Sequence, residues 1–205
     1  MAEDPRLFIT PYRENLLEKL GISEEDILTI FDEKSSNAGF FKRGTGKKLR
    51  KRCTPIDKFA YLIDQVVGVY DEQHPNEKLN KEPLAAVQGW FVVNGAGAYG
   101  VLLIYQDQAF ILHTKFGANF GLVGLAATAK DLTRKMPVDL AKLVKANPLN
   151  KTSVFNYLHY GRFAFYVCSP LEVIHGLKIA KKLVDGDSPD ITGSDIIETA
   201  KGMSL

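Results

Sequence analysis

The stretch from Pro83 to Ala129 constrains the fold most, because its 47 residues carry only two formal charges, Asp107 and Lys115. A stretch so poor in charge belongs in the interior, so it is the predicted core. Its apolar runs are separated by Gly95-Ala96-Gly97-Ala98 and by Gln106-Asp107-Gln108, which are typical of turns. The predicted strands lie at 87–93, 101–105 and 109–113. Connections this short join antiparallel neighbours, so we expect a three-strand meander at about 85–114.

A second antiparallel pair is predicted as a hairpin at about 153–168, turning at Tyr160-Gly161. Between the two groups of strands, residues 122–135 have a helical pattern, and a short helix is expected from Pro137 to Ala146. The central strands alternate little, which favours burial on both sides. The pattern predicts an α+β fold in which helices cover one face of a mainly antiparallel sheet.

The first third of the chain has a helical pattern with clear start signals. A hydroxyl residue precedes proline at Thr10-Pro11 and at Thr54-Pro55, and Ser23 is followed by three acidic residues. Ser169-Pro170-Leu171-Glu172 has the pattern of a capping box with proline inserted, and it predicts a late helix. Glycine, serine and asparagine interrupt residues 34–53, which are therefore predicted to form a loop.

These elements predict one globular domain over residues 1–205. We divide it into a helical part at 1–71 that contains the loop at 34–53, an α+β core at 84–184 and a polar tail at 185–205. The tail is expected to include a short helix at 194–200. A homo-oligomer is an open alternative, because the central strands are apolar enough to form an interface as well as a core.

The composition is that of a globular protein, with 45% hydrophobic and 24% charged residues. The first ten residues contain early acids and no apolar run, so we expect a soluble protein of the cytoplasm or nucleus that is not secreted. No run is long and apolar enough to predict a membrane span. Cys53 and Cys168 have neither metal-ligand spacing nor a disulfide pattern, so no metal and no cofactor is predicted.

Basic residues are concentrated in one short segment. Seven of the eleven residues at 42–52 are Lys or Arg and none is acidic, whereas the whole chain has a net charge of +2. Such a local positive field attracts polyanions, chiefly nucleic acid or an anionic lipid surface. The alternatives are a solvated loop without a specific partner and a localisation signal at Lys47–Arg52.

Two phenylalanines precede the cations, and aromatic rings next to Lys and Arg suit single strands, whose bases stack while their phosphates pair. We therefore predict a non-catalytic nucleic-acid-binding protein that prefers RNA or single-stranded DNA to duplex. The predicted binding residues are Phe40, Phe41, Lys42, Arg43, Lys47, Lys48, Arg50, Lys51, Arg52 and Arg162. Arg162 is included because His159 and Tyr160 accompany it at the second hairpin turn.

Two other functions stay open. A metal-independent ribonuclease would use His113 as the base and Lys115 to stabilise the phosphorane, since both lie on one face of a predicted strand. An interaction module would bind a protein or a small ligand at the glycine-containing turns 95–100 and 116–121. The first of these turns fits G-x-G-x-x-G, but a strand-like run follows it where a dinucleotide site needs a helix, so a hairpin turn is predicted.

Overall fold

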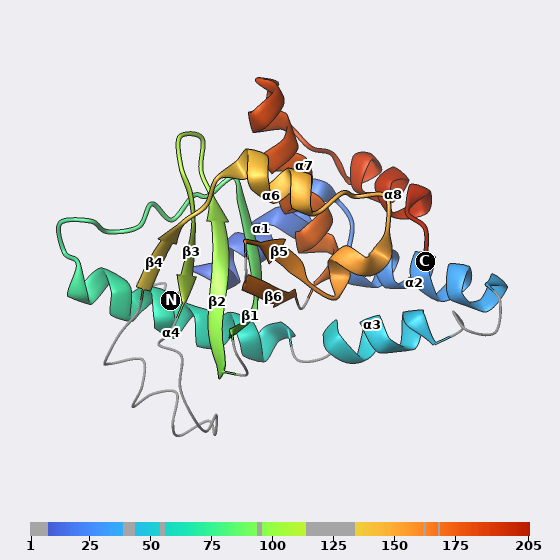
Figure 1. The fold of residues 1–205 in the computed structure, drawn as a ribbon, viewed down its shortest axis with the longest axis horizontal. Helices are drawn as coiled ribbons and strands as arrows, with labels where there is room; N and C mark the ends of the chain where they lie inside the picture. The colour runs from blue at the N-terminus through green and yellow to red at the C-terminus, as the bar shows by residue number, and fades with distance from the viewer. Residues whose placement is uncertain are drawn as a thin grey trace.

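The computed structural model describes residues 8–38, 44–53, 56–93, 96–113, 134–161, 163–167 and 169–205. Helices come first, and strands and helices follow (Figure 1). The first helices are α1 (Ile9–Leu20), α2 (Glu24–Asn37), α3 (Thr45–Cys53) and α4 (Ile56–Gln73). The strands are β1 (Ala85–Val93), β2 (Ala96–Ile104), β3 (Ala109–His113), β4 (Arg134–Pro137), β5 (Leu158–Tyr160) and β6 (Phe163–Val167). The later helices are α6 (Leu140–Ala146), the 3₁₀ turn η2 (Thr152–Phe155), α7 (Pro170–Asp185) and α8 (Gly193–Gly202).

The described strands form one antiparallel sheet in the order β4-β3-β2-β1-β6-β5. The meander at 85–113 and the β5–β6 hairpin are both present, so the α+β class and its mainly antiparallel sheet are confirmed. The hairpin is shorter than predicted, because residues 153–155 belong to the 3₁₀ turn η2 and β5 begins only at Leu158. β1 joins the two groups, because it pairs with β2 along its whole length and with β6 over Gly89–Val92.

Helices cover both faces of this sheet, so the prediction of one covered face is wrong. On one side, Val87 and Leu102 pack into a core shared with α7 and α2. On the other side, Val101 and Leu103 pack under Ile63 and Val66 of α4. The physical reason is that strands without alternation are apolar on both faces, so each face needs its own layer of helices.

The N-terminus of α1 is capped from a distance. The buried carboxylate of Asp64 in α4 accepts the backbone N–H groups of Phe8 at 2.7 Å and Ile9 at 2.5 Å. It also accepts the hydroxyl of Thr10 at 2.7 Å. The helix therefore begins at Ile9, and Thr10, predicted to be the cap, instead donates to the residue that caps it.

The edge of β1 is closed by side chains where β6 no longer reaches it. The N–H of Ala86 donates to the Tyr12 hydroxyl at 3.0 Å. The N–H of Gln88 donates to the Glu172 carboxylate at 3.0 Å. Unpaired N–H groups at a buried sheet edge are costly, so Tyr12 and Glu172 act as substitutes for a missing strand.

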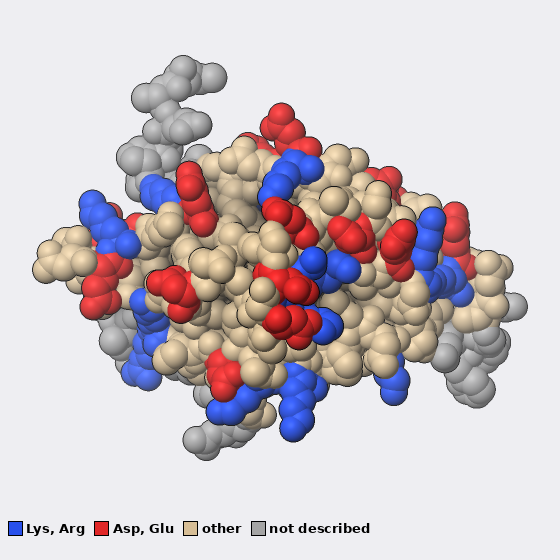
Figure 2. Space-filling view, turned by 90° about the horizontal axis from the view of Figure 1, so that it is seen from above, with Lys and Arg blue, Asp and Glu red and all other residues tan. Residues whose placement is uncertain are grey.

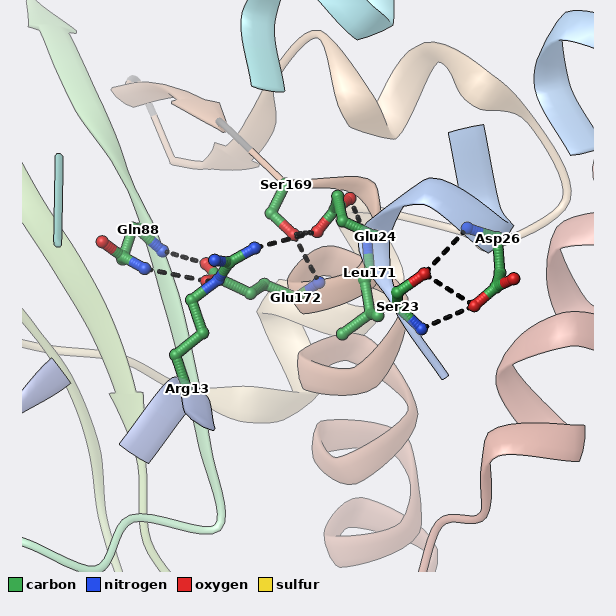
Figure 3. A network of polar contacts seen from close by, with 8 residues as sticks. All are labelled: Arg13, Ser23, Glu24, Asp26, Gln88, Ser169, Leu171 and Glu172. Carbon is green, nitrogen blue, oxygen red and sulfur yellow. Dashed lines mark hydrogen bonds and ion pairs between the residues drawn. The ribbon is translucent and has the colours of Figure 1, made fainter. Parts of the chain in front are cut away.

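The start of α7 is part of the same buried network (Figure 3). Ser169 accepts the N–H of Glu172 at 3.0 Å, as predicted, and its hydroxyl donates to Glu24. Glu24 also accepts the N–H of Leu171 at 3.2 Å. The reciprocal half of the predicted capping box is absent, because the Glu172 carboxylate is directed instead to Gln88, with Nε2 at 2.8 Å, and to Arg13, with Nε at 3.3 Å.

Two other segments differ from the prediction, and one agrees with it. The loop predicted at 34–53 is wrong, because α2 continues to Asn37 and residues 45–53 form α3. Residues 134–135, predicted as the end of a helix, start β4, and the next helix begins at Leu140 with Asp139 as its cap. The helix in the polar tail is confirmed as α8, whose Ile196 and Ala200 belong to the core.

Candidate nucleic-acid interface

The basic helix α3 is fixed along α2. Arg50 donates to Glu25 and to Asp32, both at 2.6 Å. The backbones approach closely at Gly46, whose N–H donates to Ser35 at 2.9 Å. A Cβ at Gly46 would lie 2.1 Å from Asp32 Oδ1 and 2.9 Å from its Cα, so only glycine fits there. Glycine was taken as a signal for a loop at this position, whereas its role is close packing of two helices.

The opposite face of α3 presents cations to solvent. Lys47, Lys48 and Lys51 are exposed, while Leu49 is buried against the core. Within the described residues, no ion pair joins any of the three lysines to a carboxylate. Arg50 differs from them, because its guanidinium is already paired. Phe40, Phe41, Lys42, Arg43 and Arg162 lie outside the described residues, as does the side chain of Arg52.

A hollow of about 540 Å³ adjoins this face of α3. Lys48 and Lys151 contribute ammonium groups to its lining, and hydroxyl and amide groups surround them. The complete lining is Thr45, Lys48, Leu49, Lys151, Thr152, Ser153, Asn156, Ser204 and Leu205. None of these described lining residues is Asp or Glu. We call this hollow the α3 pocket.

The far wall of the α3 pocket is held by backbone hydrogen bonds. Thr152 N–H donates to the Ser204 carbonyl at 2.8 Å, and Ser204 N–H donates to the Asn150 carbonyl at 3.0 Å. The C-terminal segment is in turn held against α2, because Lys34 Nζ lies 2.5 Å from the Met203 carbonyl oxygen. Residues from three segments that are far apart in sequence, 45–49, 151–156 and 204–205, therefore form one site. No pattern along the chain predicted this site.

An aromatic cluster lies one residue beyond the pocket. Tyr157, next to Asn156, packs its ring edge-on against Tyr166 with centroids 4.4 Å apart. The ring of His159 lies 5.9 Å from that of Tyr157, and His159 is exposed. His159 was predicted to lie at the second hairpin turn, and the structure places the ring of Tyr157 beside it. Tyr160 is different, since its hydroxyl accepts the N–H of Asp139.

The described residues over α6, α7 and α8 show no comparable concentration of positive charge. Figure 2 shows the side of the molecule on which α6, α7 and α8 lie, and there acidic and basic side chains are interspersed. Lys142 pairs with Asp139 at 3.3 Å and Lys181 with Asp185 at 2.5 Å. Opposite charges that alternate in this way cancel within a Debye length, so this face has little attraction for a polyanion.

The proposed ribonuclease pair is not favoured by the geometry. His113 ends β3 and is only 6% exposed, and its main chain lies between Gly100 and Arg134. A base that takes a proton from a ribose hydroxyl has to be reachable by the substrate. Lys115 lies outside the described residues. In the described part of the chain, no group of three or more His, Cys, Asp or Glu residues could hold a metal ion.

The Glu24–Glu172 network is a second candidate, because strongly shifted pKa values gather at active sites. Burial raises the pKa of Glu172 to about 7, although Arg13 acts in the opposite direction. Burial also raises the pKa of Glu24. However, both carboxylates bind backbone N–H groups that would otherwise lack a partner, and Glu172 is 1% exposed. We therefore interpret the network as structural.

A wider groove of about 940 Å³ runs between α1 and α7. Burial lowers the pKa of His175 in its wall to about 4, and Nδ1 of this ring has no hydrogen-bond partner among the described residues. The rim carries both signs of charge, with Lys19 and Lys81 near Glu82 and Asp190. The sequence analysis predicted a ligand site at residues 95–100 and 116–121, so it did not predict this groove. The second of those turns belongs to residues 114–133, which lie outside the described residues.

Comparisons of the chain with protein-family models, with curated proteins and with solved structures found no match. Within the described residues, no helix combines the length and the apolar character needed to cross a membrane. The function therefore has to be inferred from the arrangement of side chains alone.

Proposed function

We propose that this protein binds single-stranded nucleic acid, RNA or DNA, along the exposed face of α3 and over the α3 pocket. The observation that carries the proposal is the group of lysines on one side of a docked helix, with no carboxylate paired to them among the described residues. Lysines of this kind neutralise phosphates and release the counterions condensed on the nucleic acid, which drives association. The proposed role is binding without catalysis, and the proposed location is the cytoplasm or nucleus.

The aromatic cluster favours single strands over duplex. Unpaired bases stack on exposed rings with any sequence, while a basic surface follows the backbone. Tyr157 and His159 follow Asn156 of the pocket in the sequence, and their rings lie 5.9 Å apart, so we propose that bases stack on them while phosphates bind at α3. In a duplex the bases are stacked inside the helix, so a duplex would bind only through contacts between its phosphates and the lysines.

A localisation signal at Lys47–Arg52 is less consistent with the geometry. A receptor that reads a short basic peptide needs access to successive side chains. Leu49 is buried in the core, and Arg50 is bound to Glu25 and Asp32. The cations that stay accessible lie on one face of a helix, which suits a surface contact better than capture of an extended peptide.

The proposal is tested by fluorescence anisotropy with a labelled single-stranded RNA, the same sequence as DNA, and a duplex, each over a series of salt concentrations. The test variant is Lys47→Gln/Lys48→Gln/Lys51→Gln, with Arg50 left intact because it holds α3 in place. We expect weaker binding and a salt slope that falls by about 2, since each lost contact to a single strand removes roughly 0.7.

The matched control is Lys78→Gln/Lys145→Gln/Lys201→Gln, which removes the same charge from exposed lysines that belong neither to α3 nor to the lining of the α3 pocket. It should bind almost as the unmodified protein does. Equal losses in both variants would show that only net charge matters and would overturn the assignment to α3. Absence of binding by the unmodified protein at low salt would overturn the proposed function itself.

A further inference from the structure

We infer that the α3 pocket is a site for a terminal phosphate, that is, a phosphomonoester at the end of a nucleic-acid strand or on a free nucleotide. The inference rests on the proposed function for the class of ligand. It adds that the strand is bound at its end, through the terminal phosphate group, in the α3 pocket. The observation that carries it is the convergence of Lys48, Lys151 and several hydroxyl groups in one hollow.

The pocket offers the donors that a phosphomonoester needs. Its three terminal oxygens accept hydrogen bonds strongly, and charge-assisted bonds from ammonium groups are the strongest of these. Lys48 of α3 and Lys151, which precedes η2, both line the pocket and carry ammonium donors, and Ser153, Thr45 and Asn156 carry neutral ones. The side chains of these three neutral residues make no hydrogen bond to another described residue, so they are available to a ligand.

The charge of the pocket matches a monoester better than an internal phosphodiester. Lys48 and Lys151 bring two positive charges to the hollow, and none of its described lining residues is Asp or Glu. A monoester has a charge of about −1.5 to −2 near neutral pH, whereas each internal phosphate carries a single charge. A net positive hollow therefore attracts the end of a strand more strongly than its middle.

The size and rigidity of the pocket also suit a nucleotide. A volume of about 540 Å³ falls within the usual range for sites of small ligands, roughly 300–1,000 Å³. The backbone that carries the donors is held in place, because Lys151 pairs with Ser204 in a parallel bridge and α3 is fixed to α2 through Arg50. Binding of an anion then orders the lysine side chains without also having to order the main chain.

The test compares three versions of one short labelled RNA, with a phosphate at the 5′ end, at the 3′ end, or with hydroxyl groups at both ends. An unlabelled nucleoside monophosphate serves as competitor. We expect the unmodified protein to prefer one phosphorylated end by about tenfold or more, the gain from a charge-assisted contact. Lys151→Gln/Ser153→Ala should lose this preference, because its affinity for the phosphorylated RNA should fall much further than its affinity for the RNA with two hydroxyl ends.

The control Lys145→Gln removes an exposed lysine of α6 and should keep the preference. Equal affinity for the three RNAs, without competition by the monophosphate, would overturn the terminal-phosphate site and leave the salt-dependent binding of the proposed function standing. Binding of the monophosphate without binding of any RNA would support the site with a free nucleotide as its ligand and would overturn the proposed function. A preference that persists in Lys151→Gln/Ser153→Ala would place the phosphate elsewhere and overturn the inference.

Discussion

At the scale of single residues, charged side chains have different roles according to their neighbours. Arg50 belongs to the basic segment, yet its ion pairs with two carboxylates of α2 fix α3 against that helix. Lys48, two positions earlier, is exposed and lines the α3 pocket. Acidic residues differ in the same way. Exposed acids such as Glu72 face solvent, whereas Asp64 is buried and accepts hydrogen bonds from four donors at the start of α1.

Replacing Asp64 with alanine should destabilise the fold strongly. The substitution leaves the N–H groups of Phe8 and Ile9 buried without an acceptor, and a loss of about 2–4 kcal/mol is expected. Urea unfolding followed by circular dichroism measures it. The control is Glu72→Ala, which removes an exposed acid from the same helix. A loss no larger than that of the control would show that the cap contributes little.

At the scale of elements, the approach of α3 to α2 determines where the basic side chains lie. The contact depends on Gly46, because α2 leaves no room for a larger residue. Leu49 and Cys53 are buried on the same side of α3, so the lysines are left on the other. The distribution of charge around α3 is therefore a consequence of helix packing.

The substitution Gly46→Ala should displace α3 from α2. Its Cβ would meet the backbone of Asp32, which cannot move aside as a flexible side chain could, and we expect a loss of about 1–3 kcal/mol. Gly44→Ala is a close control, because a Cβ there meets nothing within 4 Å. Thermal unfolding of both variants makes the comparison. Equal midpoints for the two would contradict the close contact.

At the scale of the whole molecule, the Glu24–Glu172 network joins elements that are distant in sequence (Figure 3). Arg13 comes from α1, Glu24 from α2, Gln88 from β1, and Ser169 and Glu172 from α7. The network lies where the edge of β1, the start of α7 and two N-terminal helices meet. It therefore ties the helical third of the chain to the sheet, and its protonation affects the stability of the whole fold.

The free energy of unfolding should depend on pH through Glu172. Its pKa is raised to about 7 by burial, so between about pH 4.5 and 7 the folded state retains a proton that the unfolded state has lost. Raising the pH through this window therefore destabilises the protein, by at most about 1.4 kcal/mol per pH unit. His175 has the opposite effect, because its pKa is lowered to about 4 and acidification favours unfolding.

The contribution of Glu172 is isolated by comparison with Glu172→Gln in urea titrations at several pH values. As the pH rises from 4.5 to 7, the free energy of unfolding of the unmodified protein should fall relative to that of Glu172→Gln. This trend should appear whatever the absolute stability of the variant. Glu198→Gln, at an exposed site in α8, should show no such trend. A constant difference for Glu172→Gln would mean that Glu172 titrates normally in the folded state.

The sequence by itself determined the elements whose signals are local. The apolar, turn-separated centre specified the meander, because strand pairs joined by two to four residues have almost no other topology. Ser23 and Ser169 marked the starts of α2 and α7, because capping depends on residues one turn apart. The concentration of positive charge at 42–52 was also visible, since charge needs no fold to be counted.

Only the tertiary structure decided which of these residues meet. From its neighbours in sequence, Gly46 indicates a loop. In the structure it lies in a helix, and the absence of a side chain lets α2 pack closely against it. Asp64, Tyr12 and Glu172 satisfy backbone groups 56, 74 and 84 positions away, a relation that periodicity does not encode. The α3 pocket likewise exists only because residues near 48, 152 and 204 come together. Packing and hydrogen bonding act over distance in space, so patterns along the chain indicate the elements but not the sites formed between them.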